Sequence, residues 1–310
     1  MRQPCTRRTA LKRIGAGLAW AWLLPRQPLA GTGGLLRMPI PATGETLPAI
    51  GLGTWRTFNV GSDRRMLDAR TEVVRAFFAH GGGLVDSSPM YGSAPDLMGH
   101  ALEVLGHPDT LFAAEKVWSP AGGDAYAQFN ALLERWRVRR FDLVQVHNLV
   151  DWRAQLVALR QMKAEGKLRY IGITTSHGRR HREFEQVMAD EALDFVQLTY
   201  NLTHREAENR LLPLALERGL AVIANRPYDG GRLVKWLKRS EPVPEWARQA
   251  FGCRTWADYL LRFIVSHPAV TCAIPATTRV DHLEENMAAG LGSLPSPEVR
   301  ARMVRHVESL

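Results

Sequence analysis

The stretch GGGLVDSSPMYG, residues 81–92, places a strand, a carboxylate and a tyrosine close together. Glycines precede the short apolar run of Leu84 and Val85, and Asp86 closes that run. An aspartate at the end of a strand is most often a cap or a turn former. A cap does not explain Tyr91, which follows five residues later, so the rest of the chain has to decide between structure and chemistry.

Apolar runs of strand length recur along the chain and alternate with segments of helix length. The runs are residues 49–54, 84–86, 111–117, 142–147, 170–175, 195–201, 221–225 and 271–275. Residues 151–167 illustrate the helical segments, because Leu156, Leu159 and Met162 recur there at helical spacing before a glycine. Eight strands alternating with helices over about 250 residues predict an α/β fold, a parallel (β/α)8 TIM barrel.

Two details of the first half of the chain refine this prediction. A doubly wound sheet is the alternative fold, but residues 51–56, GLGTWR, lack the third glycine of a dinucleotide fingerprint, and no helix begins there. Upstream, residues 35–50 are typical of two short strands around Thr43 and Gly44. The sequence therefore predicts one barrel over residues 31–310, with an N-terminal β-hairpin closing its bottom.

Residues 1–30 have the composition of a targeting segment. The basic stretch TRRTALK, residues 6–12, precedes an apolar run at 14–24, which at about 1.5 Å per residue is too short for a bilayer of about 30 Å. A small-residue cleavage site ends at Ala30. The pattern resembles a twin-arginine signal with Ala10 in place of the usual phenylalanine. It predicts export to the periplasm by the twin-arginine machinery without stable membrane anchoring; a basic, uncleaved cytoplasmic helix is the alternative.

Charge and cysteine content exclude several classes of function. The formal net charge is +9, but residues 1–30 hold six lysines and arginines and no acid, which leaves +3 for the remainder. Nucleic-acid binding is therefore disfavoured, and basic clusters at 135–140 and 177–182 are interpreted as solvated helix ends or loops. Beyond residue 30 only Cys253 and Cys272 remain, too few for a disulfide framework or a metal cluster.

Polar residues of catalytic type lie at the ends of three successive predicted strands. Asp86 ends the second strand, Lys116 lies near the end of the third, His147 ends the fourth, and Tyr91 follows Asp86 in its loop. In a barrel, the carboxyl ends of the strands converge on one mouth. Each residue alone has an ordinary explanation as a cap, a surface charge, a satisfied polar group or a packing ring. The four together indicate a catalytic site.

This combination resembles the aldo-keto reductase family. The motifs that carry the resemblance are VDSSPMYG (85–92), AAEKVW (113–118) and VQVHNL (144–149). The similarity extends roughly from residue 35 to 295, and ANRPYDGGRL (224–233) together with the export signal resembles a periplasmic branch of the family. The resemblance implies a catalytic tetrad of Asp86, Tyr91, Lys116 and His147.

The chemistry of carbonyl reduction agrees with this tetrad. A hydride added to a carbonyl carbon develops an alkoxide that needs a proton, and a free tyrosine with a pKa of about 10 is a weak acid at neutral pH. We expect Lys116 to lower the pKa of Tyr91, and Asp86 to keep Lys116 charged. His147 would donate a hydrogen bond to the substrate oxygen. Tyr91 is the expected proton donor, and no metal is required.

The resemblance also implies a nicotinamide cofactor, with NADP(H) favoured over NAD(H). Thr174 and Gln197 match the family's contacts with the nicotinamide amide, whereas Thr175 replaces the usual asparagine. Asn225 stands where an aromatic ring usually stacks, and Trp55 or Tyr228 could supply that ring instead. The residues implied to contact the cofactor are Gly53, Thr54, Trp55, Thr174, Thr175, Gln197, Asn225, Arg226, Pro227, Thr277, Thr278, Arg279, His282, Glu285 and Asn286.

The adenosine end of the cofactor is assigned to residues 276–286, ATTRVDHLEEN. The resemblance implies that the threonine hydroxyls hold phosphate, that Arg279 or His282 meets a 2′-phosphate, and that Glu285 and Asn286 contact adenine. Ala276 replaces the lysine that is usual in the family, which weakens the preference for NADP(H).

The predicted function is an NADP(H)-dependent oxidoreductase that reduces a small aldehyde or ketone, or oxidises the alcohol. One alternative is a nucleotide-binding, redox-sensing module without substantial turnover, although such a module does not need all four tetrad residues. Another is a metal-dependent hydrolase that uses His177 and His181, which have i, i+4 spacing. The arginines around these two histidines would repel a cation, which argues against the hydrolase.

Overall fold

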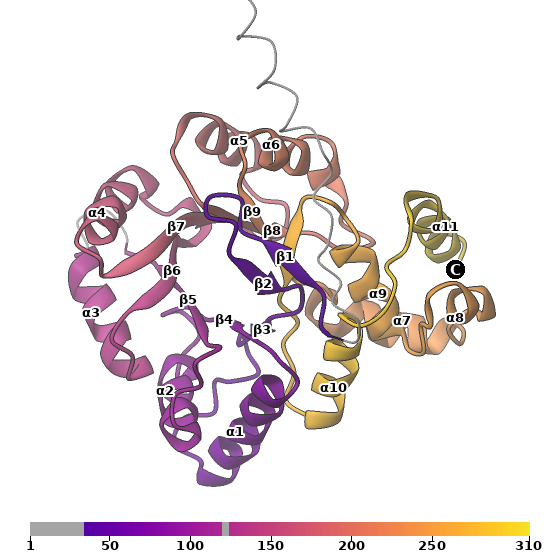
Figure 1. Ribbon diagram of the computed structural model, residues 1–310, viewed down its shortest axis with the longest axis horizontal. Helices are drawn as coiled ribbons and strands as arrows, with labels where there is room; N and C mark the ends of the chain where they lie inside the picture. Colours follow the sequence, from indigo (N-terminus) through magenta and orange to yellow (C-terminus); the bar gives the residue numbers. More distant parts are fainter. Residues whose placement is uncertain (1–33, 120–123) are drawn as a thin grey trace, which may run out of the picture.

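The computed structural model describes residues 34–119 and 124–310, so the predicted signal segment lies outside the described part (Figure 1). Eight parallel strands follow one another in sequence order around a barrel. They are β3 (Leu52–Gly53), β4 (Leu84–Asp86), β5 (Phe112–Val117), β6 (Phe141–Val146), β7 (Leu168–Thr174), β8 (Phe195–Thr199), β9 (Ala221–Asn225) and β10 (Val270–Ala273). A parallel bridge between Ile50 and Ala273 joins the first strand to the last. The predicted (β/α)8 barrel is confirmed.

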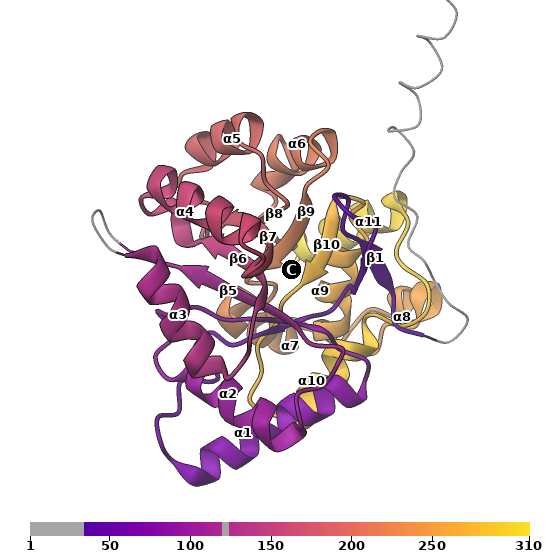
Figure 2. The same ribbon diagram turned by 60° about the vertical axis from the view of Figure 1, so that its left-hand side comes forward.

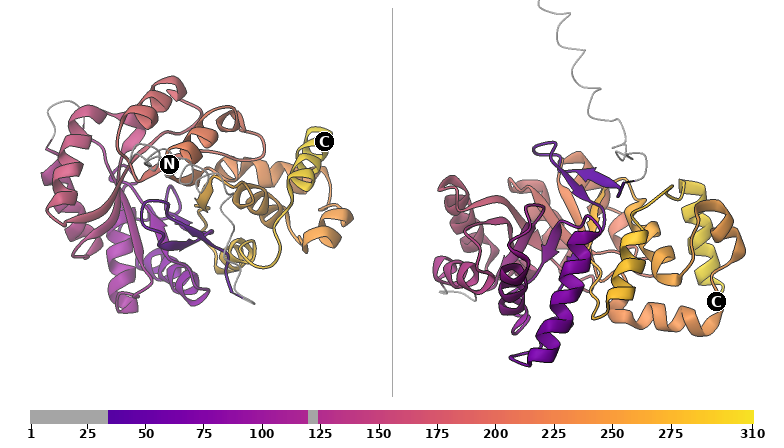
Figure 3. Two further views of the ribbon diagram at one scale, coloured as in Figure 1. Left: turned by 45° about the horizontal axis from the view of Figure 1, so that its top comes forward. Right: turned by 60° about the horizontal axis from the view of Figure 1, so that its bottom comes forward.

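Helices surround the strands, and α1 to α4 follow one another around them in chain order (Figures 1 and 2). The surrounding helices are α1 (Arg64–Ala79), α2 (Ala94–Leu105), α3 (Ala125–Trp136), α4 (Trp152–Ala164), α5 (His181–Asp190), α6 (Leu211–Glu217), α9 (Trp256–Val265) and α10 (Val280–Ala288). Three more, α7 (Arg232–Ser240), α8 (Glu245–Phe251) and α11 (Pro297–Glu308), lie to one side (Figure 3). Over residues 34–119 and 124–310, none of the helices has the length and apolar character needed to cross a bilayer.

The helical pattern of residues 151–167 corresponds to α4. Leu156, Leu159 and Met162 are all buried and face the barrel, as their spacing predicts. The helix ends just before Gly166, whose φ of +74° lies in the left-handed region that glycine adopts without strain. Local sequence signals therefore set both the inner face and the end of this helix.

The predicted hairpin consists of β1 (Arg37–Pro39) and β2 (Thr46–Pro48), which pair antiparallel. Its turn includes Gly44 at a φ of +76°, and the hairpin lies across the centre of the barrel in Figure 1. Ile40 and Leu47 belong to one buried cluster with barrel residues that include Phe112 and Phe195. Burial of this apolar surface stabilises the hairpin against the amino-terminal ends of the strands. The predicted closure of the barrel's bottom is confirmed.

Candidate active site

The carboxyl ends of the strands, opposite the hairpin, surround a cavity of about 420 Å³. Asp86, Tyr91 and His147 line this cavity, and Lys116 lies fully buried directly behind Asp86. The cavity is also lined by nine of the residues expected to contact a cofactor: Gly53, Thr54, Trp55, Thr174, Thr175, Gln197, Asn225, Arg226 and Pro227. The structure therefore brings together the four residues of the expected tetrad and the expected nicotinamide end of the site.

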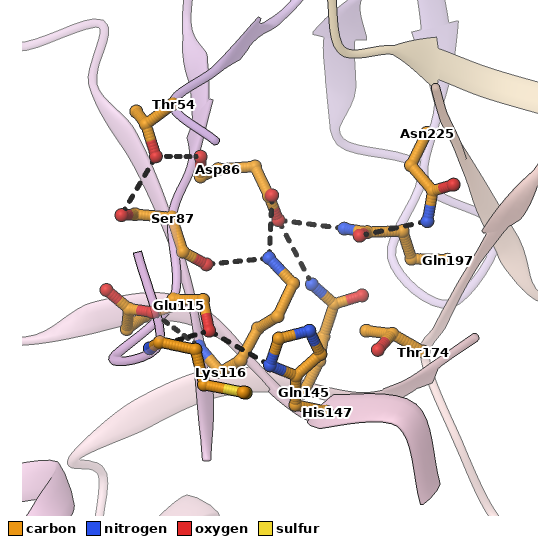
Figure 4. A network of polar contacts seen from close by, with 12 residues as sticks. Thr54, Asp86, Ser87, Glu115, Lys116, Gln145, His147, Thr174, Gln197 and Asn225 are labelled. Atoms are coloured by element: carbon orange, nitrogen blue, oxygen red, sulfur yellow. Dashed lines mark hydrogen bonds and ion pairs between the residues drawn. The ribbon is translucent and has the colours of Figure 1, made fainter. Parts of the chain in front are cut away.

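A buried ion pair occupies the centre of the site (Figure 4). Lys116 Nζ, at the end of β5, donates to Asp86 Oδ2 at 2.6 Å and to the Ser87 carbonyl at 2.6 Å. The two ionic side chains are 1% and 2% exposed. Gln197 Nε2 donates to the other carboxylate oxygen of Asp86 at 2.8 Å. Burial is the largest single influence on Lys116 and lowers its pKa, but the charges of Asp86, Tyr91 and Glu115 and the hydrogen bond to Asp86 together outweigh it. The pKa therefore stays above its usual value and the ammonium is kept.

The phenol of Tyr91 differs from the expectation drawn from the sequence. Lys116 Nζ lies 5.3 Å from the centroid of the Tyr91 ring. Burial raises the pKa of Tyr91, and the charge of Lys116 opposes this increase without overcoming it. Lys116 acts in the expected direction and lowers the pKa of Tyr91, but burial, which the sequence does not reveal, is larger and leaves the pKa above its usual value. Tyr91 is protonated at neutral pH, which is the form required of an acid.

His147 begins the 3₁₀ turn η1 (His147–Leu149) directly after β6. Its burial, with a smaller contribution from the charge of Lys116, lowers the pKa of the imidazole to about 3. The rings of Tyr91 and His147 meet edge to face, with centroids 6.0 Å apart. At neutral pH the cavity thus presents a neutral phenol and a neutral imidazole beside one buried ammonium group.

The hydroxyls expected to contact nicotinamide are already bound within the protein. Thr54 Oγ1 donates to the Asp86 carbonyl at 3.0 Å and lies 2.9 Å from Ser87 Oγ. Thr174 Oγ1 accepts the N–H of Asn148 at 2.9 Å. Both threonines line the cavity, but these hydrogen bonds fix the strand ends and the loops that follow them.

The amides of Gln197 and Asn225 form a chain that ends at Asp86 (Figure 4). Asn225 Oδ1 accepts from Thr199 Oγ1 at 2.8 Å, and Asn225 Nδ2 donates to the Thr175 carbonyl at 2.9 Å. Asn225 Nδ2 also lies 3.4 Å from Gln197 Oε1. Asn225 therefore braces β7, β8 and β9 at the place where an aromatic ring is usual in the resembling family.

Of the residues assigned to the adenosine end, Ala276 lines this cavity and the others lie outside it, after β10 and in α10. Arg279 forms an ion pair with Asp281, and Tyr228 Oη donates to Asn286 Oδ1 at 2.5 Å. Glu285 Oε1 is shielded from solvent and has no hydrogen-bond partner among the described residues. The other residues of this group are Thr277, Thr278 and His282. Tyr228, which lines the cavity, thus connects its rim to α10.

The mouth of the cavity is positively charged. Arg56 and Arg179 line it, Arg226 lines it but pairs with Asp229 at 2.8 Å, and among the described lining residues the only acid is Asp86, which is neutralised by Lys116. The guanidinium groups of Arg56 and Arg226 lie 4.4 and 5.4 Å from the Trp55 ring centroid. A mouth of this charge attracts anionic ligands.

Over residues 49–303 the sequence matches the Aldo/keto reductase family. The chain belongs to this family. It is 29% identical over 261 residues to the methylglyoxal reductase YeaE of Escherichia coli, which covers 82% of this chain and 89% of that protein. It is also 29% identical over 249 residues to an NADH-specific methylglyoxal reductase of Escherichia coli, which covers 68% of this chain and 73% of that protein.

Solved structures of aldo-keto reductases from Klebsiella pneumoniae share the fold. One, in complex with NADPH, has a TM-score of 0.75 at 25% identity and covers 89% of this chain and 96% of that chain. Another, in complex with NADP and acetate, has a TM-score of 0.72 at 28% identity and covers 85% of this chain and 93% of that chain. Family membership and the cavity make this aldo/keto reductase an NAD(P)H-dependent oxidoreductase.

Two buried polar residues of this aldo/keto reductase were missed by sequence reasoning. Ser88 Oγ lies 2.9 Å from His147 Nδ1. Glu115 accepts the N–H of Lys116 and the indole N–H of Trp136, both at 2.8 Å, and burial raises its pKa to about 8. The available signals were the second serine of DSS and the acidic residue inside the apolar run AAEKV.

The ion pair predicts strong coupling between Asp86 and Lys116. Asp86→Asn should lower the free energy of unfolding by about 3–5 kcal/mol, because it leaves a buried ammonium without its counter-ion. Lys116→Met should have a similar cost, while the double variant should recover most of the loss. Denaturant unfolding of the four proteins at pH 7 measures this coupling.

Asp96→Asn is the matched control. Asp96 also forms an ion pair, with Arg135 at 2.8 Å, but its own side chain is 55% exposed to solvent. It should change the free energy of unfolding by at most about 1 kcal/mol. If the double variant of Asp86 and Lys116 lost as much free energy of unfolding as the two single variants together, the coupling would be contradicted.

The low pKa of His147 predicts a specific loss of stability in acid. Between the folded value of about 3 and the unfolded value of about 6.5, only the unfolded chain binds a proton at this residue. Unfolding is therefore favoured as pH falls below about 6.5, and the effect levels off near pH 3. From pH 7 to pH 5, the wild type should lose about 2 kcal/mol more than His147→Gln in denaturant unfolding. An equal pH dependence of the two proteins would show that folded His147 titrates normally.

Proposed function

We propose that this protein is an NADP(H)-dependent oxidoreductase that reduces a small aldehyde or ketone to an alcohol, or catalyses the reverse. The observation that carries the proposal is the protonated phenol of Tyr91 beside the buried Lys116–Asp86 pair, with a neutral His147 on the same cavity. Each of these groups is in the protonation state that carbonyl reduction requires at neutral pH.

In the proposed reaction Tyr91 is the acid and His147 orients the substrate. A bound nicotinamide supplies the hydride for the carbonyl carbon. The Tyr91 hydroxyl gives its proton to the carbonyl oxygen, which forms the alcohol O–H bond and leaves a phenolate. Lys116 stabilises that phenolate, and Asp86 keeps Lys116 charged and in place. A ring N–H of His147 stabilises the charge that develops on the oxygen.

The described residues fit a nicotinamide dinucleotide. Arg56 and Arg179 at the mouth suit its phosphates, and Glu285 Oε1 offers a shielded acceptor for the amino group of adenine. We favour NADP(H) over NAD(H) because Arg279 and His282 are basic side chains beside the assigned 2′-phosphate position. Two considerations weigh against a strong preference: Arg279 pairs with Asp281, and one of the relatives is an NADH-specific enzyme.

The acid role of Tyr91 is tested by Tyr91→Phe. Turnover of aldehydes should fall by about 10²- to 10⁴-fold, the usual contribution of a general acid, because the ring stays and only the hydroxyl is lost. The dissociation constant for NADPH, followed by fluorescence, should change little. Steady-state kinetics on a panel of aldehydes and quinones gives the first quantity.

Tyr126→Phe removes an exposed hydroxyl on α3 and serves as the control, with turnover expected at the wild-type level. Failure of the wild type to bind either NADPH or NADH would overturn the cofactor assignment. Tight binding without turnover of any panel compound would instead support a nucleotide-binding redox sensor.

We also propose that residues 1–30 direct export to the periplasm by the twin-arginine machinery. The paired arginines, the short apolar run and the small residue Ala30 support this proposal. In a Gram-negative host, replacing Arg7 and Arg8 by lysine should retain the precursor in the cytoplasmic fraction, whereas Arg2→Lys should not. Periplasmic protein of mature size from the double variant would exclude this route.

A further inference from the structure

Ser88 makes two contacts that together define the direction of its hydroxyl. It lies two residues after Asp86, is fully buried, and accepts the N–H of Met90 at 3.3 Å. Its Oγ is 2.9 Å from His147 Nδ1. Within residues 34–119 and 124–310, the Ser88 hydroxyl has no other hydrogen-bond partner. The hydroxyl proton is therefore satisfied only if it points to His147 Nδ1, because a buried unpaired donor is costly.

The neutral imidazole of His147 carries one ring proton, and the contact with Ser88 decides which nitrogen holds it. If Nδ1 accepts from Ser88, the proton must be on Nε2. If Nδ1 were the donor, the Ser88 proton would be left without an acceptor in a buried environment. The first arrangement satisfies every polar group of the contact, and the second does not.

We propose that Ser88 is a positioning residue that fixes His147 in the tautomer with its proton on Nε2, directed to the carbonyl oxygen of the substrate. This inference rests on the proposed function for its consequence in catalysis, but the tautomer itself does not. His147 lines the cavity while Ser88 is enclosed behind it, so the two ring nitrogens have separate tasks. Nδ1 is held by the protein, and Nε2 is left for the ligand.

The direction of this hydrogen bond matters because a carbonyl oxygen only accepts. An imidazole with its proton on Nε2 donates to that oxygen and stabilises the charge that develops there. The opposite tautomer would present a lone pair to the same oxygen and repel it. Tyr91 supplies the other donor at this site, and the ammonium of Lys116 lies behind it. Ser88 thus acts on the substrate only through His147.

The test is the ¹⁵N spectrum of the folded protein labelled with ¹⁵N-histidine, at neutral pH. Protonated and unprotonated ring nitrogens have widely separated ¹⁵N shifts, and the His147→Gln variant assigns the resonances among the ten histidines of the chain. We expect the proton of His147 on Nε2 and an unprotonated, hydrogen-bonded Nδ1. A proton on Nδ1 of the wild type would overturn the proposal without any variant.

Ser88→Ala should shift the Nδ1 resonance of His147 and admit the second tautomer. It should also lower kcat/KM for aldehydes by roughly 5- to 10-fold, the effect of one lost hydrogen bond, with little change in NADPH affinity. Ser88→Thr keeps the hydroxyl and should restore the wild-type spectrum. An unchanged Nδ1 resonance in folded Ser88→Ala would also overturn the proposal.

Ser87→Ala is the matched control for the spectrum, because it removes a buried hydroxyl from the same loop that contacts Thr54 and not His147. It should leave the His147 resonances in place. The two proposals fail separately: a wild type that binds no nucleotide would refute the proposed function, whereas an active enzyme with its His147 proton on Nδ1 would refute only the role of Ser88.

Discussion

The rest of the site depends on the buried ion pair between Asp86 and Lys116. Burying two charges away from water costs free energy. Here that cost is offset by hydrogen bonds to the ammonium protons and carboxylate oxygen that the ion pair itself leaves unsatisfied. The Ser87 carbonyl and the Gln197 amide provide them. Asp86, Ser87 and Lys116 come from the neighbouring strands β4 and β5 and the loop after β4, whereas Gln197 reaches the carboxylate of Asp86 from β8, across the barrel. Only the hydrogen bond from Gln197 therefore depends on the completed barrel.

Burial and the ammonium of Lys116 together set the protonation states of the neighbouring groups. At His147 burial is the larger influence against the imidazolium, and the charge of Lys116 acts in the same direction. At Tyr91 the two effects conflict, and burial prevails. The result is one fixed positive charge with two neutral hydrogen-bonding groups beside it. Such an arrangement costs little to reorganise when a substrate oxygen becomes negative, which is the condition for electrostatic catalysis.

The sequence was sufficient to predict the features that repeat or lie at fixed spacing. The strand runs predicted the barrel, and residues 35–50 predicted the hairpin that closes it. Asp86, Lys116 and His147 were recognisable because they end successive strands. The direction of the pKa shift of Tyr91 was not predictable, because it depends on desolvation by elements distant in the chain. Ser88 and Glu115 were missed for a related reason: a buried polar side chain gains a specific partner only in the folded barrel.

Asn225 shows how one departure from the family pattern can be consistent with the rest of the site. A phenyl ring at this position could neither accept from Thr199 nor donate to the Thr175 carbonyl, as Asn225 does. Those two contacts fix which end of the Asn225 amide faces Gln197, so its Nδ2 meets Gln197 Oε1. Gln197 is then obliged to present Nε2, a donor, to Asp86. The asparagine thus supports the ionised carboxylate from three strands away, and through it the charge of Lys116.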